Sequence, residues 1–121
     1  MFEILVEEKF DAAHCLRGYS GNCERLHGHT YRVQILLRTD KLDSIGLALD
    51  FRGVRSELRA VLNYLDHNYM NELPEFSQIN PSAENLARYI YGKLAEKYSE
   101  LLHKVTVWET EGAAASYWEA I

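Results

Sequence analysis

The sequence predicts an α+β domain in which two helices lie on one face of an antiparallel four-stranded sheet. Three observations lead to this fold class. Two segments near the N-terminus alternate apolar and polar residues, two central segments repeat apolar residues at helical spacing, and two short segments near the C-terminus alternate again. With 121 residues, 47% hydrophobic and 26% charged, the chain has the size and composition of one domain spanning 1–121.

The first two strands are predicted from their period of two. Even positions of residues 2–14 are mostly apolar, and the last of them is His14. A Gly/Ser/Asn-rich loop over residues 17–23 follows. Odd positions of residues 27–37 then share one face, which begins with two histidines and continues with apolar residues. Both strands therefore have an apolar face with histidines near the connecting loop.

The two helices are predicted from their caps and their apolar stripes. Asp50 is the expected N-cap of a helix that runs through about Leu65. Pro81 and Ser82 open the second helix, whose stripe repeats every four residues from Leu86.

The C-terminal segments HKVTVWETEG and ASYWEAI alternate as two further strands. The predicted order is strand–strand–helix–helix–strand–strand. Because both helices cover the same face of the sheet, the second face is expected to be exposed or to be closed by other subunits.

Composition argues against several partners. The formal net charge is −5 and no block of basic residues occurs, so nucleic acid and anionic membranes are not expected partners. No apolar run approaches 20 residues, and the acidic start MFEILVEEKF does not resemble a signal peptide. We therefore expect a cytoplasmic protein, in which Cys15 and Cys23 are free thiols.

Three histidines form a candidate metal site. His27 and His29 are two apart on a strand, so both leave the same face about 6.6 Å apart. His14 ends the apolar face of the preceding strand and would lie beside them in an antiparallel pair. Three imidazoles on one tetrahedral ion leave an open fourth position, which is typical of catalytic zinc. The alternative is that each is an ordinary polar strand residue.

Other residues could carry chemistry near this site. Cys23 lies four residues before His27, where a cation would favour its thiolate, and it could act as base, nucleophile or fourth ligand. Asp66 and His67 form a candidate proton-transfer pair, although a histidine stabilised by the helix dipole is the alternative. Glu109 shares a face with apolar residues, so it either meets a cation or binds a ligand that offers N–H donors. A solvated carboxylate at a strand end is its alternative.

These residues occur in motifs that resemble the 6-pyruvoyltetrahydropterin synthase family. The motifs FDAAH, CERLHGH, LDH, NPSAENLA and WET appear in this order and cover nearly the whole chain. The three-residue gap between the cysteine and HGH resembles the bacterial 6-carboxytetrahydropterin synthases of the queuosine pathway. The resemblance implies the tunnelling fold, in which the strands of three subunits form a barrel. It also implies a homohexamer made of two trimers, with active sites between subunits.

The resemblance implies a zinc lyase that acts on a pterin. Three residues match the family's zinc ligands: His14, His27 and His29. Glu109 matches the glutamate that anchors the pterin ring through its amino group and ring N–H. Ser82 lies in the segment that helps to line the pterin pocket, where the family often has threonine. The implied substrate is 7,8-dihydroneopterin triphosphate, which gives 6-carboxytetrahydropterin, acetaldehyde and triphosphate.

The resemblance also implies the proton-transfer groups and one variation. Cys23 matches the catalytic cysteine, which removes a carbon-bound proton, and Asp66 with His67 completes the set. Glu24 creates a second motif, E-x-x-H-G-H, found in a subgroup that cleaves dihydroneopterin to 6-hydroxymethyldihydropterin for folate synthesis. That activity, alone or in addition, remains open, as do a solvated Glu24, a 6-pyruvoyltetrahydropterin synthase, and a non-enzymatic protein in which Cys23 closes a structural zinc site.

Overall fold

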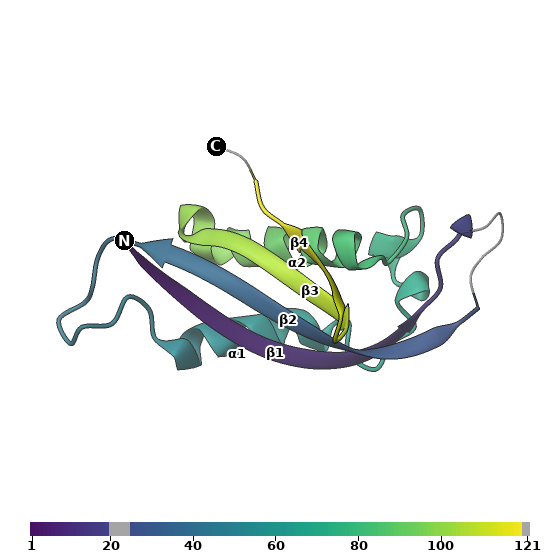
Figure 1. Ribbon diagram of the computed structural model, residues 1–121, viewed down its shortest axis with the longest axis horizontal. Helices are drawn as coiled ribbons and strands as arrows, with labels where there is room; N and C mark the ends of the chain where they lie inside the picture. The colour runs from purple at the N-terminus through teal and green to yellow at the C-terminus, as the bar shows by residue number, and fades with distance from the viewer. Residues whose placement is uncertain (20–24, 120–121) are drawn as a thin grey trace.

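The computed structural model describes residues 1–19 and 25–119. Its element order is the predicted strand–strand–helix–helix–strand–strand, with short 3₁₀ helices in the connections (Figure 1). The elements are β1 (Phe2–His14), β2 (His27–Thr39), α1 (Phe51–Asn63), η2 (Met70–Glu72), η3 (Pro74–Phe76), α2 (Ala83–Tyr98), η4 (Ser99–Leu101), β3 (Leu102–Thr110) and β4 (Ala113–Tyr117).

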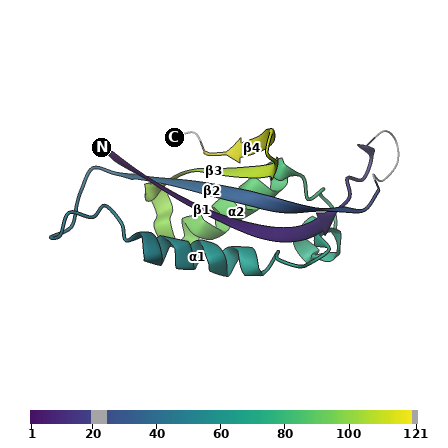
Figure 2. The same cartoon turned by 60° about the horizontal axis from the view of Figure 1, so that its bottom comes forward.

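The four strands form one antiparallel sheet in the order β1-β2-β3-β4. β1 and β2 are the long strands, and they extend past the shorter β3 and β4 toward the end of the molecule where their connecting loop lies (Figure 1). Figure 2 shows both helices on the same side of the sheet. The predicted α+β class, with two helices on one face of a four-stranded antiparallel sheet, is confirmed.

The hydrophobic core fills the space between the sheet and the helices. Even positions of β1 and odd positions of β2 alternate with more exposed neighbours, as the sequence predicts. Burying this apolar surface is the main force that holds the helices against the sheet. The residues at its centre are fully buried: Val33, Ile35, Leu58, Leu62, Leu86, Ile90, Val105 and Val107.

The opposite face of the sheet is mostly polar, with the cross-strand pair Leu5 and Leu36 between its polar pairs. Glu7 lies across from Gln34, whose Nε2 donates to Glu7 Oε1 at 2.8 Å. Glu3 lies across from Arg38, whose Nε donates to Glu3 Oε2 at 2.9 Å. Such cross-strand pairs stabilise a solvated sheet face by a few tenths of a kcal/mol to about 1 kcal/mol each.

Both helices begin where the sequence predicts. Asp50 caps α1 by accepting the N–H of Arg52, and Ser82 caps α2 by accepting the N–H of Asn85. The end of α1 differs from the prediction, because the helix stops at Asn63. The chain continues in turns to Leu65, which is still fully buried in the core.

Two details of the C-terminal half also differ from the prediction. The last strand, expected over residues 115–121, runs from Ala113 to Tyr117, because a two-residue turn at Glu111 and Gly112 starts it earlier. The segment after α1, expected to be irregular, contains two 3₁₀ helices. None of the helices among the described residues has the length and apolarity that a membrane span requires.

Replacing the cap of α1 should destabilise the fold modestly. Asp50→Ala removes the side-chain acceptor at the N-terminus of α1 and should lower the free energy of unfolding by about 1 kcal/mol. Urea denaturation measures this loss. The matched control Asp40→Ala removes the same charge from an exposed residue outside the helix. Equal losses in the two variants would show that charge, not capping, is responsible.

Candidate metal centre

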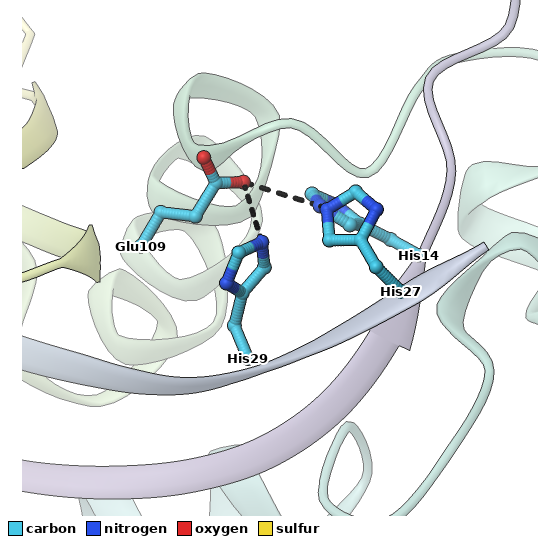
Figure 3. Close-up of side chains that lie close together, drawn as sticks. All are labelled: His14, His27, His29 and Glu109. Carbon is cyan, nitrogen blue, oxygen red and sulfur yellow. Dashed lines mark hydrogen bonds and ion pairs between the residues drawn. The ribbon is translucent and has the colours of Figure 1, made fainter. Parts of the chain in front are cut away.

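The register of β1 and β2 brings the three histidines together. His14 is the direct cross-strand partner of His27, and His29 lies opposite Ala12. The ring centroid of His27 lies 4.6 Å from that of His14 and 4.6 Å from that of His29. Figure 3 shows the three imidazoles directed toward one another from the ends of the two strands. His14 is completely buried, and the side chain of His29 is only 20% exposed.

Two backbone carbonyls fix the orientation of the imidazoles. His14 Nδ1 lies 2.8 Å from the carbonyl oxygen of Pro81, and His27 Nδ1 lies 2.8 Å from that of Arg25. Because a carbonyl can only accept a hydrogen bond, each Nδ1 carries a proton and donates it. The Nε2 atom of each neutral ring therefore presents a lone pair, and this second contact is typical of metal-binding histidines.

A carboxylate at a β-bulge lies in the same cluster. Between β3 and β4, Trp108 pairs with Ala114 and Thr110 pairs with Ala113, so Glu109 is the extra residue. Bulges of this kind redirect a side chain and are common beside functional sites. Glu109 Oε1 lies 3.1 Å from His14 Nε2 and 3.7 Å from His29 Nε2 (Figure 3).

The electrostatics of this cluster favour a cation. The Nε2 atoms of His14 and His27 are 2.9 Å apart, and both point their lone pairs inward together with the Glu109 carboxylate. Lone pairs and a carboxylate this close repel one another unless a proton or a metal ion lies between them. The candidate donor atoms all lie within 4.8 Å of one another. Three imidazoles and one carboxylate suit zinc and several other divalent ions.

Side-chain amides hold the loop that supplies the Pro81 carbonyl. Asn71 accepts the backbone N–H of Cys15 at 2.9 Å and donates to the Cys15 carbonyl at 2.9 Å. Asn80 bridges the backbone of Arg17 in the same way, at 2.8 and 2.9 Å. These four bonds bind the end of β1 to the segment before α2. Pro81 is consequently held beside His14.

The guanidinium of Arg17 is engaged in the same structure. Its nitrogens donate to the carbonyls of Asn71, Phe76 and Ile79. Sequence reasoning did not identify these supporting residues, because a backbone carbonyl can belong to any residue type. The only available signal was the NPS tripeptide immediately before the second helix.

The ring of Tyr31 packs against two histidines of the candidate metal centre. Its ring stacks on Phe10 with centroids 4.8 Å apart and meets the edges of His14 and His29 at 5.8 and 5.5 Å. Burial, and secondarily the nearby Glu109 carboxylate, raises the pKa of its phenol far above the ordinary value. Tyr31 therefore stays neutral and acts as a rigid wall against which two imidazoles pack.

The centre opens to solvent on one side. A hollow of about 500 Å³ is lined by Leu16, Tyr19, His27, His29 and Glu109. A small molecule could reach the donor atoms from this hollow, which makes it the candidate substrate approach.

Asp66 and His67 form a separate group with Asp11. Asp66 Oδ1 accepts the backbone N–H of Asp11 at 2.9 Å, and its Oδ2 lies 3.1 Å from His67 Nδ1. The backbone N–H of His67 donates to the Asp11 carbonyl at 2.6 Å. The side chain of His67 is 78% exposed. It lines a second hollow, of about 530 Å³, whose lining also includes His29.

The hydrogen bond from the Asp11 N–H stabilises the charged form of Asp66. This backbone N–H, followed by the contact with His67, lowers the pKa of the Asp66 carboxyl below the ordinary value. The lowered pKa means that folding favours the charged carboxylate, which lies 3.1 Å from His67 Nδ1.

The predictions for the remaining residues compare with the structure in different ways. Cys23 and Glu24 lie outside the described residues. Ser82 is present as the cap of α2, where its hydroxyl accepts the Asn85 N–H at 3.2 Å. The prediction that Cys15 is a free thiol is wrong, since Cys15 is disulfide-bonded and no described cysteine is free. That prediction used the expected compartment and the spacing along the chain, neither of which reports where a sulfur atom lies.

Comparison with known proteins identifies the family. The chain belongs to the 6-pyruvoyl tetrahydropterin synthase family, whose profile matches residues 3–120. A 6-carboxy-5,6,7,8-tetrahydropterin synthase of Synechocystis sp. is 36% identical, covering 97% of this chain and 93% of that protein. One of the same name from Haemophilus influenzae is 30% identical, covering 98% and 100%. The resemblance stated from the motifs is thus confirmed.

A solved structure supports the fold assignment. The 6-pyruvoyl tetrahydropterin synthase of Caenorhabditis elegans superimposes with a TM-score of 0.88 at 27% sequence identity. The match covers 98% of this chain and 96% of that one. The tunnelling-fold subunit is therefore common to both.

Substituting Asp66 should destabilise the protein in a pH-dependent way. Because folding lowers the pKa of Asp66, its charge contributes stability above the ordinary aspartate pKa of about 3.9, and this contribution disappears as pH falls through the lowered value. Asp66→Asn should cost about 1 kcal/mol near neutral pH and progressively less in acid. Urea unfolding across this range measures the difference. A pH-independent loss, or an equal loss in the exposed control Asp40→Asn, would contradict the assignment.

Proposed function

We propose that this protein is a zinc-dependent lyase, a 6-carboxy-5,6,7,8-tetrahydropterin synthase. It would convert 7,8-dihydroneopterin triphosphate to 6-carboxytetrahydropterin, with release of acetaldehyde and triphosphate, in the cytoplasmic queuosine pathway. The observation that carries the proposal is the convergence of His14, His27 and His29 beside an accessible hollow. The relatives named above support the choice of reaction, because they share that name and match most of the chain.

The three histidines would hold the zinc ion through Nε2. When bound, zinc supplies Lewis-acid stabilisation to the side-chain hydroxyls of the substrate and orients them. The carbonyls of Pro81 and Arg25 would keep the His14 and His27 rings in the tautomer that coordinates. The buried wall formed by Tyr31 would keep water from that side of the centre.

Once the disulfide of Cys15 is reduced, Cys23 would be the base that removes a carbon-bound proton beside the pterin ring. Its position four residues before His27 supports a location near the metal, where a cation favours the thiolate. Asp66 and His67 would move the partner proton, with Asp66 holding the imidazole by the 3.1 Å contact.

Glu109 and Ser82 would bind the pterin. The Glu109 carboxylate lines the hollow and can accept hydrogen bonds from the amino group and ring N–H of a pterin. The Ser82 hydroxyl uses its lone pair to cap α2, so its own O–H remains available to donate.

The proposed assembly is a homohexamer of two trimers. A separate Asp66–His67 group with an exposed imidazole supports a site that is completed between subunits. The polar face of the sheet would line the barrel.

The second candidate function depends on Glu24. The E-x-x-H-G-H motif favours cleavage of dihydroneopterin to 6-hydroxymethyldihydropterin, as the sole activity or beside the first. A 6-pyruvoyltetrahydropterin synthase and a structural zinc protein are the further alternatives.

The released aldehyde distinguishes these functions. The zinc-loaded protein is incubated, with a thiol reductant to keep Cys23 reduced, with dihydroneopterin triphosphate or with dihydroneopterin. We expect acetaldehyde from the triphosphate; glycolaldehyde from dihydroneopterin would support the second function. Loss of triphosphate without an aldehyde indicates the pyruvoyl-forming reaction, and no turnover of either substrate would refute the proposal.

Variants of the HGH loop separate catalysis from metal binding. Cys23→Ala should reduce acetaldehyde release by about 10²-fold or more and should keep zinc bound, because it removes the base alone. Zinc content is measured by atomic absorption. Glu24→Ala is the matched control in the same loop and should affect only cleavage of dihydroneopterin. Full turnover by Cys23→Ala would show that another group is the base, and loss of zinc would favour the structural site.

A further inference from the structure

The Glu109 carboxylate has two possible partners, a metal ion and a pterin. One carboxylate oxygen cannot contact both at the same time. The proposed function uses its carboxylate to accept N–H groups of a pterin. The structure instead directs Oε1 at the metal-binding nitrogens of His14 and His29, while the carboxylate also lines the hollow (Figure 3). Without substrate, Glu109 is therefore positioned as a metal-facing group.

The distances match a coordination site. Two donors that lie about 2.0–2.1 Å from a tetrahedral zinc ion are roughly 3.3 Å from each other. Glu109 Oε1 lies 3.1 and 3.7 Å from the Nε2 atoms of His14 and His29. The Nε2 atoms of His14 and His27 are 2.9 Å apart. These three spacings lie on either side of the tetrahedral value, and all candidate donor atoms lie within 4.8 Å of one another, so Oε1 is part of a donor set close enough to surround one ion.

Charge and local backbone support the same role. The side chain of Glu109 is 33% exposed, and both of its ion-pair contacts are to imidazoles whose lone pairs serve the same centre. A half-buried carboxylate is stable when a cation balances it. The bulge at Glu109 places this side chain at the rim of the hollow, so rotation about its own bonds can move the carboxylate from the metal into the hollow.

We propose that Glu109 is the fourth metal ligand in the substrate-free protein and that it exchanges the metal for the pterin ring when substrate binds. The carboxylate leaves the metal, accepts the pterin N–H groups, and vacates the position that a substrate hydroxyl then takes. The centre is thereby closed at rest and open only when a pterin is present. The exchange rests on the proposed function, whereas the ligation does not.

The ligation is tested by metal affinity. Glu109→Gln keeps the size of the side chain but removes the anionic donor, so its zinc affinity, measured by chelator competition, should fall about 10-fold or more. Glu111→Gln, two residues away and exposed, is the matched control and should bind zinc like the parent protein. Replacing zinc by Co²⁺ adds a second readout, since loss of a ligand changes the visible spectrum. Unchanged affinity and an unchanged cobalt spectrum in Glu109→Gln would overturn the ligation.

The exchange is tested with 6-methylpterin, which has the ring but no side-chain hydroxyls. Adding it to the cobalt protein should change the spectrum of the parent and not that of Glu109→Gln, in which no carboxylate is left to depart. A change in both would indicate direct coordination by the pterin, and a change in neither would mean that Glu109 stays in place. Either result overturns the exchange. Acetaldehyde release by the parent protein, measured separately, decides the proposed function whatever these spectra show.

Discussion

The candidate metal centre depends on two hydrogen bonds from imidazole Nδ1 atoms to backbone carbonyls. The carbonyls of Pro81 and Arg25 accept these bonds. The Nε2 atoms of His14 and His27, which lie 2.9 Å apart, then direct their lone pairs toward each other. Without these acceptors the rings could rotate or change tautomer, and the convergence would be lost. Much of the neighbouring irregular chain, including the amide clamps of Asn71 and Asn80, holds one of these carbonyls in place.

The residues of the candidate metal centre lie at one end of the sheet rather than in its middle. β1 and β2 bring three histidines through simple antiparallel register, and β3 adds Glu109 through a bulge. A small domain can build a precise site this way, because the core between sheet and helices stays apolar and the polar groups are confined to one edge. Function and stability then depend on largely separate residues. Asp66 and Ser82 are exceptions, because each also makes a hydrogen bond that stabilises the fold.

How much of the fold and of the candidate site can be predicted depends on whether each sequence pattern acts locally along the chain. Strand alternation and helix caps are local, so the sheet, both helix starts and the proximity of His14 to His27 and His29 could be predicted. The same alternation placed Glu109 on the apolar face, where a cation, a ligand or solvent were the expected partners; its contacts with His14 and His29 could not be chosen among these, because they depend on tertiary packing. The Pro81 carbonyl was missed for a related reason: any residue type supplies the same oxygen.

The backbone conformation at His67 limits which residues can replace it. Its backbone has φ of 59°, in the left-handed region that glycine, asparagine, aspartate and histidine enter most readily. Most other side chains would add strain of about 1–3 kcal/mol at this position. Of the residues that enter this region readily, only histidine has an imidazole. The backbone geometry and the proposed proton transfer would therefore restrict this position independently, and histidine satisfies both.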